Sequence, residues 1–295
     1  METLSLAIIV LIISALLYAW KKEMLISQMI VVINFIVFLL LFLPSLFPIN
    51  FSRKLIFYDL AFNPSYLISG SKMYTLFTSL FLHGDVLHIL MNMLFLLLIG
   101  IPFEQRIGRK TFAFLYFSTG ICACLFFSIF EWGNQVMLIG ASGAIFGLLG
   151  AFAALYPRDK VVMPLPSPII FFVKMPVIVA ALLFTSIETL YTFSNISDGI
   201  AHTAHIGGLI SGIALSQFIK KRKVKEEKFD FLPLEAYITT ERQKEIFRKA
   251  KEADVPEVRE AWLSYLLREL KCPKCGGGIK KDGTCKNCGF FMKNQ

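Results

Sequence analysis

Seven long apolar runs constrain this chain of 295 residues more than any other feature of its sequence. They cover residues 4–20, 25–47, 86–101, 111–130, 140–156, 176–193 and 200–219. A helix of about 20 apolar residues crosses the ~30 Å hydrocarbon core of a bilayer. With 56% hydrophobic and only 17% charged residues, the chain is not disordered, a coiled coil or an ordinary soluble enzyme. The sequence therefore predicts an all-α polytopic membrane protein.

Charge divides the chain into two parts. Of the formal net charge of +9, residues 1–219 carry +2 and residues 220–295 carry +7. We therefore expect a membrane body that ends near Ile219, followed by a soluble basic tail.

The positions of lysine and arginine predict the orientation of the body, because cytoplasmic loops carry the excess of positive charge. With the N-terminus outside, the inner loops carry 8 Lys/Arg and the outer loops 3. The first run is not read as a cleaved signal peptide, because Lys21 and Lys22 follow it instead of preceding it. The long outer loop, residues 48–85, is expected to lie in the interfacial zone. We thus predict a multi-pass cell-membrane protein with a cytoplasmic tail.

Polar and ionisable side chains inside membrane spans are costly and therefore candidates for function. Those near the outer ends of the runs are His83, His88, Asn92, Ser142, His202 and His205. Ser142 lies two residues into the fifth run and His205 five residues into the seventh, and both runs cross from outside to inside. At ~1.5 Å per residue their depths differ by only about 5 Å. Residues from separate spans are therefore expected to converge in the outer leaflet.

Small residues recur every four positions beside these two polar residues. The stripes are Gly143, Gly147 and Ala151 in the fifth run, and Ala204, Gly208 and Gly212 in the seventh. Such stripes let helix backbones approach closely. We therefore predict that the two spans bring Ser142 and His205 within hydrogen-bond reach.

A serine beside a histidine is a nucleophile beside its general base, since the imidazole takes the hydroxyl proton. No acidic residue is clearly placed to orient His205. Asp198 and Glu188 are outer-loop candidates, but neither is well placed in the sequence. The pattern therefore favours a Ser–His dyad.

Groups that would stabilise an oxyanion lie nearby. Ser142 begins a helix, where backbone N–H groups and the helix dipole favour negative charge. His88 and Asn92 are four residues apart on one helix face and can donate to the same oxyanion. Gly140 permits close backbone approach before the serine.

For other polar residues a structural role is considered beside a functional one. His202 is expected to cap a helix or line the cavity, and Glu104 to cap a helix or pair with Arg106 or Arg109. The ring of His83 is equally compatible with bonding loop backbone and with contacting substrate.

Together these motifs resemble those of the rhomboid family of intramembrane serine proteases. The similarity rests on Gly140-Ala-Ser142-Gly143, Ala204-His205-x-x-Gly208-x-x-x-Gly212 and His83-x4-His88-x3-Asn92. It covers about residues 25–219. It implies a six-helix core with a water-accessible cavity, Ser142 as nucleophile and His205 as general base. It also implies an oxyanion hole of His88, Asn92 and the Ser142 backbone N–H, with Gly140 beside it.

Two positions depart from the family's common pattern. Where members often have Trp-Arg, this loop reads Tyr74-Thr75-Leu76. The aromatic residue four after the serine is Phe146, which can pack under the imidazole but has no hydroxyl. The resemblance leaves an additional N-terminal transmembrane helix at 1–24 before the six-helix domain at 25–219, a basic helical linker at 220–270 and a zinc-ribbon-like module at 271–295.

The tail ends in a metal-binding pattern. Two amphipathic helices, 239–252 and 255–270, precede two C-x2-C pairs, Cys272, Cys275, Cys285 and Cys288. This spacing is typical of a four-cysteine zinc site, which leaves no open position and is therefore structural. Iron in a rubredoxin-like site is an alternative with the same ligands. Disulfides are disfavoured in a reducing compartment, and no cofactor is expected for catalysis.

The sequence thus predicts an intramembrane serine endopeptidase that cleaves in or near transmembrane segments of membrane-protein substrates. Because a helical peptide bond in lipid is shielded, a substrate is expected to unwind near its outer end. The alternative is a non-catalytic rhomboid-like protein that binds transmembrane segments. The basic tail suits anionic lipid or an unknown protein partner of the zinc ribbon better than nucleic acid.

Overall fold

The computed structural model describes the chain except residues 47–52, 166–170, 195–200, 221–228, 254–255 and 293–295. The chain divides into two compact units, Met1–Val224 and Lys225–Gln295. The end of the predicted run 25–47, the start of the run 200–219 and most of the basic segment 220–225 lie outside the described residues.

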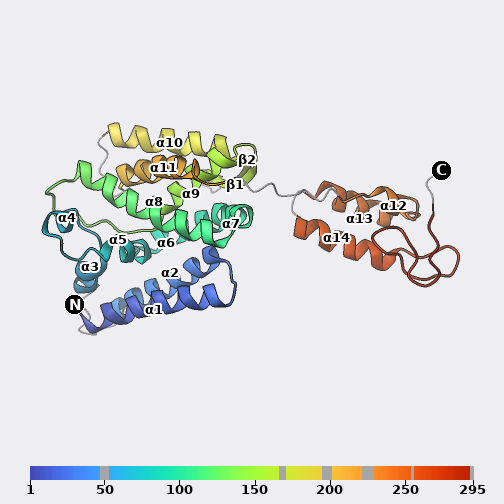
Figure 1. Cartoon of the computed structure of the whole chain (residues 1–295), viewed down its shortest axis with the longest axis horizontal. Coiled ribbons are helices and arrows are strands. Elements are labelled where there is room, and N and C mark those ends of the chain that lie inside the picture. Colours follow the sequence, from blue (N-terminus) through green and yellow to red (C-terminus); the bar gives the residue numbers. More distant parts are fainter. Residues whose placement is uncertain (47–52, 166–170, 195–200, 221–228, 254–255, 293–295) are drawn as a thin grey trace. The chain divides into compact units, whose positions relative to one another are not determined.

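Within the described residues, the first unit is built from seven long helical segments (Figure 1). They are α1 (Thr3–Lys21), α2 (Ile26–Phe42), a continuous segment of α6 (Val86–Phe95), η3 (Leu96–Gly100) and α7 (Ile101–Ile107), then α8 (Arg109–Phe130), α9 (Ser142–Leu155), α10 (Val177–Phe193) and α11 (His202–Ser216). By length and composition, α1, α6 to α7, and α8 can each cross a membrane, and α2, α9 and α10 are shorter apolar helices. The predicted helical membrane fold is confirmed.

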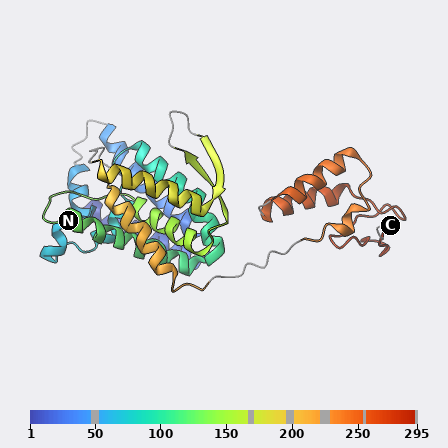
Figure 2. The same ribbon diagram turned by 90° about the horizontal axis from the view of Figure 1, so that it is seen from above.

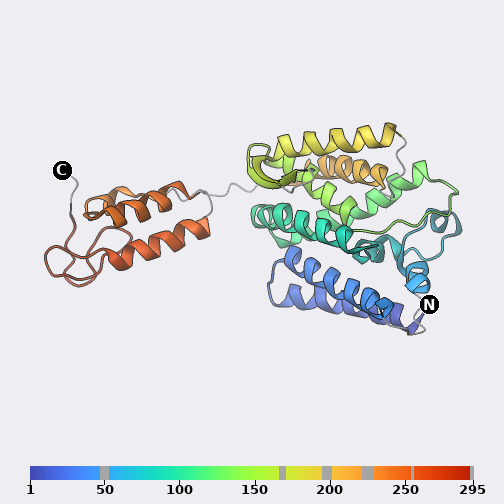
Figure 3. The same cartoon turned by 180° about the vertical axis from the view of Figure 1, so that it is seen from behind.

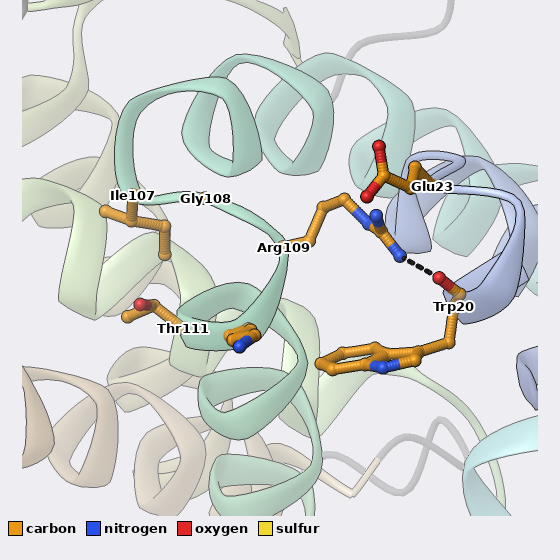
Figure 4. Close-up of a pocket in the computed structure, with 7 residues that line it drawn as sticks. Trp20, Glu23, Ile107, Gly108, Arg109 and Thr111 are labelled. Carbon is orange, nitrogen blue, oxygen red and sulfur yellow. Dashed lines mark hydrogen bonds between the residues drawn. The ribbon is translucent and has the colours of Figure 1, made fainter.

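The additional N-terminal helix packs beside α2 (Figure 3) and is tied to the rest of the unit at both ends. At one end, the Asp59 carboxylate accepts the Ser5 hydroxyl at 2.9 Å. At the other, the Arg109 guanidinium donates to the carbonyls of Ala19 at 3.2 Å and Trp20 at 2.8 Å (Figure 4). A cation on the last carbonyls of a helix also complements the helix dipole. The surrounding pocket is lined by Trp20, Glu23, Ile107, Gly108, Arg109, Lys110 and Thr111.

Glu104 has the structural role that we expected, but with a different partner. Its buried carboxylate accepts the backbone N–H of Ile26 at 2.7 Å, and the N–H and hydroxyl of Ser27 at 2.8 and 2.7 Å. It therefore caps the start of α2, where backbone N–H groups have no partner within the helix. Of the two expected roles, cap or ion pair, the structure shows the cap, and Arg106 pairs instead with Asp159 at 2.8 Å.

After α2 and the short η1 (Leu43–Leu46), the described part of the long loop at 48–85 contains four short helices, α3 (Arg53–Leu60), α4 (Ser65–Ser69), α5 (Thr75–Thr78) and η2 (Ser79–Phe81). It packs into the unit, because Phe62 and Phe81 are fully buried. Phe62 also forms an antiparallel bridge with Leu138, its N–H donating at 3.1 Å and its carbonyl accepting at 2.7 Å. The loop therefore supports the segment that leads into α9.

A pair of antiparallel strands between α9 and α10 adds to the helical fold (Figure 2). Strand β1 (Lys160–Leu165) pairs antiparallel with β2 (Phe171–Pro176). Val161 and Met163 are buried while Val162 between them is exposed, which is the period-two alternation of a strand. Each strand has 6 residues and is therefore much shorter than the apolar runs that predict the helices.

The predicted small-residue stripes are confirmed as backbone contacts between α9 and α11. A Cβ atom at Gly208 would lie 2.0 Å from the Gly143 carbonyl oxygen, and one at Gly212 would lie 1.9 Å from that of Gly147. No side chain fits at such distances, so the two helices touch through their main chains. This contact fixes the position of α11 along the axis of α9.

The second unit joins helices and cysteine loops in one core. After α12 (Leu232–Glu235) come α13 (Glu241–Glu252) and α14 (Pro256–Glu269), close to the two amphipathic helices that we predicted. Buried apolar side chains from these helices and from the cysteine-bearing segment pack together, namely Leu234, Tyr237, Ile246, Phe247, Ala250, Leu263, Leu266, Leu270, Cys272, Ile279 and Cys285. The Tyr237 hydroxyl donates to the Gly283 carbonyl at 2.8 Å. The helices thus pack directly on the cysteine-bearing segment.

Candidate functional site

Ser142 is the first residue of α9, and the backbone before it makes a turn that requires glycine. Gly140 has a φ of +114°, which residues with a side chain rarely adopt. A Cβ atom there would lie 2.7 Å from His88 Nε2 and 3.7 Å from Ser142 Oγ. The imidazole of His88 and the hydroxyl of Ser142 therefore border the same small space beside Gly140.

Gly140 supplies that space and not a hydrogen-bond donor. Its own N–H donates to the Ser79 carbonyl at 3.0 Å. This geometry fits the predicted role of Gly140, which is to permit close backbone approach before the serine. The turn is held by η2 of the long loop, and the glycine keeps the approach to Ser142 open.

His205 lies in the first turns of α11 and is buried. Its ring stacks on Phe146, with centroids 4.5 Å apart and planes 8° from parallel. The predicted packing of Phe146 under the imidazole is therefore confirmed. Residues i and i+4 share one face of a helix, so Phe146 lies directly below Ser142 on α9. The stacking thus places the imidazole along the helix face that begins with the serine.

His88 and Asn92 lie on one face of α6, which Asp85 caps by accepting the His88 N–H at 2.9 Å. The Asn92 amide donates one hydrogen to the His88 carbonyl at 2.9 Å and keeps a second hydrogen for another acceptor. His88 Nδ1 accepts the Gly84 N–H at 3.4 Å. The proton of the neutral ring then belongs on Nε2, the atom that borders the space beside Gly140.

His83 packs against this group without hydrogen bonds from its ring. The ring lies edge-on to that of His88 at 4.9 Å, and in the part of the chain that the structure describes neither ring nitrogen has a partner. Of the two alternatives for this ring, the bond to loop backbone is therefore not formed there. Arg53 donates to the carbonyls of His83 at 2.8 Å and Gly84 at 2.7 Å. An arginine from α3 thus anchors the segment in a loop that lacks the common Trp-Arg pair.

Glu188 is the residue whose position sequence reasoning missed. It lies inside α10 and not in an outer loop, and it is only 9% exposed. One carboxylate oxygen, Oε2, lies 3.0 Å from His205 Nδ1 and 2.5 Å from His202 Nδ1. Asp198, the other acidic candidate, lies outside the described residues. A carboxylate within an apolar run was itself the available signal.

His202 belongs to the same group. Its ring stacks on Tyr191, with centroids 5.1 Å apart, and is buried. His202 is a hydrogen-bond partner of Glu188, a contact that the expectation of a cap or cavity-lining residue did not include.

The tail holds a second candidate site, the four cysteines. The Sγ atoms of Cys272 and Cys288 are 3.8 Å apart and those of Cys275 and Cys285 are 3.5 Å apart, with all four within 4.8 Å of one another. Four sulfurs at ~2.3 Å from one zinc ion are separated by about 3.8 Å, whereas a disulfide bond measures ~2.05 Å. The spacing therefore fits a tetrahedral metal ion and not disulfides.

The two cysteine pairs have the same backbone turn. The N–H of Gly276 donates to the Cys272 carbonyl at 2.8 Å, and that of Gly289 donates to the Cys285 carbonyl at 3.2 Å. Both glycines have a positive φ, +71° and +68°. Backbone N–H groups, above all that of Cys288, lower the pKa of Cys285 to about 6. This cysteine is thus largely a thiolate at neutral pH, the form that binds metal.

The fold and the first site together define a class: a polytopic helical membrane protein with serine, histidine, amide and carboxylate groups gathered near the starts of α6, α9 and α11. The family model of the rhomboid domain matches residues 70–222, just over half of the chain. The chain belongs to the rhomboid family.

Individual relatives agree with this assignment. The chain is 41% identical over 91 residues to RHOMBOID-like protein 1 of Arabidopsis thaliana, covering 31% of this chain and 23% of the relative. It is 32% identical over 149 residues to RHOMBOID-like protein 4 of the same plant, covering 50% and 34%. It is 28% identical over 169 residues to Rhomboid-like protease 3 of Toxoplasma gondii, covering 57% and 59%. The chain thus spans less than two thirds of the length of these relatives.

Proposed function

We propose that this chain is an intramembrane serine endopeptidase in which Ser142 is the nucleophile and His205 the general base. The observation that carries the proposal is the stacking of His205 on Phe146, one helical turn below Ser142. Because Gly208 and Gly212 lock α11 against α9, this arrangement is set by rigid helices and not by loops. Membership of the rhomboid family supports the same reaction class.

In the proposed reaction, His205 Nε2 takes the proton of the Ser142 hydroxyl while Oγ attacks the carbonyl carbon of the scissile peptide bond. The carbonyl oxygen becomes an oxyanion that accepts hydrogen bonds from His88 Nε2–H, the free amide hydrogen of Asn92 and the backbone N–H of Ser142. His205 then gives its proton to the leaving amine. Water, activated by the same imidazole, releases the acyl group from Ser142.

The proposed substrates are membrane proteins whose transmembrane segments unwind near the outer face. A helical peptide carbonyl is already hydrogen-bonded and is shielded by side chains, so an intact helix offers no carbonyl for attack. The charge distribution supports an orientation with the N-terminus outside and the tail in the cytoplasm.

For the tail, we propose a structural zinc ion held by Cys272, Cys275, Cys285 and Cys288, with iron as the alternative metal. The ion would partly neutralise the four thiolates and cross-link the two segments that carry them. The same unit is proposed to bind a protein partner or the anionic lipid surface.

The test is cleavage of a model single-span substrate by the purified full chain in detergent. Ser142→Ala is expected to lower the rate by about a thousand-fold or more. It should also abolish labelling by a fluorophosphonate probe. Ser186→Ala, an exposed serine on α10, is the matched control and should retain full activity.

Unchanged cleavage by the Ser142→Ala variant would contradict the proposed nucleophile. A folded wild type that binds the substrate segment, but neither cleaves it nor reacts with the probe, would favour the second candidate, a non-catalytic rhomboid-like protein. Both outcomes require that the thermal transitions of the variants match that of the wild type.

A further inference from the structure

A carboxylate shared by two imidazoles lies behind the proposed base. Glu188 Oε2 is 2.5 Å from Nδ1 of His202 and 3.0 Å from Nδ1 of His205, and all three side chains are buried. Glu188 comes from α10, whereas both histidines come from α11. Resting on the proposed function, we propose that Glu188 is a positioning residue that holds His205 with its proton on Nδ1, so that Nε2 is the atom that takes the Ser142 proton.

The distances favour protons and not a metal ion between these groups. A carboxylate oxygen accepts, so both Nδ1 atoms must carry hydrogen to face it. Two ligands of one zinc ion, each at ~2.0–2.1 Å, would be separated by about 3.3 Å. The 2.5 Å separation between Glu188 and His202 is that of a short hydrogen bond. The group is therefore a hydrogen-bonded network in this structure.

The two contacts of the carboxylate are not equivalent. The contact with His202 is a hydrogen bond, whereas Nδ1 of His205 lies at 3.0 Å but out of line for a straight one. Hydrogen bonds in resting active sites are often poorly aligned and tighten as the reaction proceeds. The His205 contact can strengthen when the imidazole gains a proton and becomes positive, while His202 keeps the carboxylate in place.

Burial strengthens the attraction between the Glu188 carboxylate and a protonated imidazole. A carboxylate in a membrane body is tolerated when it is paired, and its attraction for a positive ring is weakly screened there. Among the residues that the structure describes, the other titratable groups near His205 are His202 on α11 and His88 on α6, with Tyr191 of α10 stacked on His202. Phe146 and Ser142 of α9 add no charge. The contact with a carboxylate thus comes from Glu188, which favours the protonated ring that forms during catalysis.

The experiment compares the wild type with Glu188→Gln, Glu188→Asp and the control Glu131→Gln in detergent. Glu131 lies at the end of α8, outside the site. Glu188→Gln is expected to lower kcat by about 10- to 100-fold with little change in KM, as for loss of a charge-assisted hydrogen bond made in the transition state. The pH profile of its kcat/KM should also differ from that of the wild type, because the ring loses its negative partner. Glu188→Asp should recover part of the rate, and Glu131→Gln should match the wild type.

A second measurement does not need turnover. The 15N chemical shifts of the histidine side chains, assigned with His202→Asn and His88→Asn, report which ring nitrogen carries the proton. We expect Nδ1–H for His205 in the wild type and a shift toward Nε2–H in Glu188→Gln. This result would support the positioning role even if the wild type cleaved nothing, in which case the proposed function alone would fail.

Three outcomes would overturn the inference. One is a Glu188→Gln variant with the kcat and pH profile of the wild type. Another is an Nε2–H tautomer of His205 in the wild type. The third is a second zinc ion per chain, beyond that of the tail, that is lost in Glu188→Gln, since the group would then be a metal site. Ser142→Ala, measured alongside, shows separately whether the serine chemistry itself is correct.

Discussion

The two compact units are held together by different kinds of contact. In the first, α9 and α11 meet where side chains are missing, so that the carbonyls of Gly143 and Gly147 touch the backbone of Gly208 and Gly212. In the second, the buried set is small and includes two cysteines that we propose as metal ligands. A unit as short as residues 225–295 rarely gains enough stability from an apolar core alone. Close contact between helix backbones stabilises the larger unit, and a bound metal ion would stabilise the smaller one.

The comparison extends to the buried polar groups. In the first unit many of them complete a hydrogen bond to backbone or to each other, as Glu104 does at α2, and a subset gathers at the proposed active site. In the second, the sulfur atoms face one another and need an ion to neutralise them once they are thiolates. The two units should therefore respond to different perturbations.

Metal removal is expected to have the largest effect and to act on the tail alone. Chelation, or Cys272→Ser, should unfold residues 225–295, because apparent zinc-binding free energies of ~10–16 kcal/mol contribute directly to folding in such sites. Limited proteolysis should then degrade the tail, while the thermal transition of the first unit and probe labelling of Ser142 stay unchanged. Elemental analysis would identify zinc or iron. A metal-free tail that still resists protease would contradict the proposed metal role, and Cys122→Ser serves as the control.

Gly212→Ala is the corresponding change in the first unit. Its Cβ atom would lie 1.9 Å from the Gly147 carbonyl oxygen, so α11 must move away from α9. We expect a loss of about 3 kcal/mol, or a fall in Tm of roughly 6–12 °C. Ala214→Leu adds a larger side chain at an exposed position of the same helix and should leave Tm within about 2 °C. If both variants melted alike, the close backbone contact would not be what holds these helices.

Glu104→Gln should have the smallest of the three effects. The amide keeps one acceptor oxygen but turns an NH2 group toward donors at the start of α2. A buried donor left unpaired costs ~1–3 kcal/mol. We expect Tm to fall by roughly 2–4 °C for each kcal/mol lost, with tail proteolysis unaffected. Arg106→Gln, which removes the half-exposed pair with Asp159, is the control and should change stability by less than ~1 kcal/mol. Equal losses in the two variants would show that Glu104 acts only through surface charge.

Patterns local in sequence were the most predictable. The apolar runs located the helices, and the spacing of Gly143, Gly147, Gly208 and Gly212 predicted their contact, because a helix brings every fourth residue to one face. The cysteine pairs were equally clear, since four ligands to one ion need two turns of fixed geometry. These features depend on neighbours a few residues away.

Three polar contacts between distant parts of the chain could not be predicted. Glu188 was assigned to an outer loop although it lies within the predicted run 176–193. Whether a helical residue faces a particular neighbour depends on how the helix is rotated about its axis, which the run does not specify. For the same reason the sequence did not predict that Glu104 accepts the N–H of Ser27 in α2, or that the Gly140 N–H donates to the Ser79 carbonyl. Each is a hydrogen bond between elements whose relative placement the sequence does not encode locally.

The sequence by itself determined that this is a helical membrane protein of the rhomboid type, with close helices around Ser142 and His205 and a cysteine-rich tail. Only the tertiary structure decided that Glu188 lies against His205, that a hairpin joins α9 to α10, and that the tail helices share a core with the cysteine segment. The physical reason is that periodicity specifies which face of an element is apolar. The polar atoms that meet across elements are set by the rotation and offset that packing imposes.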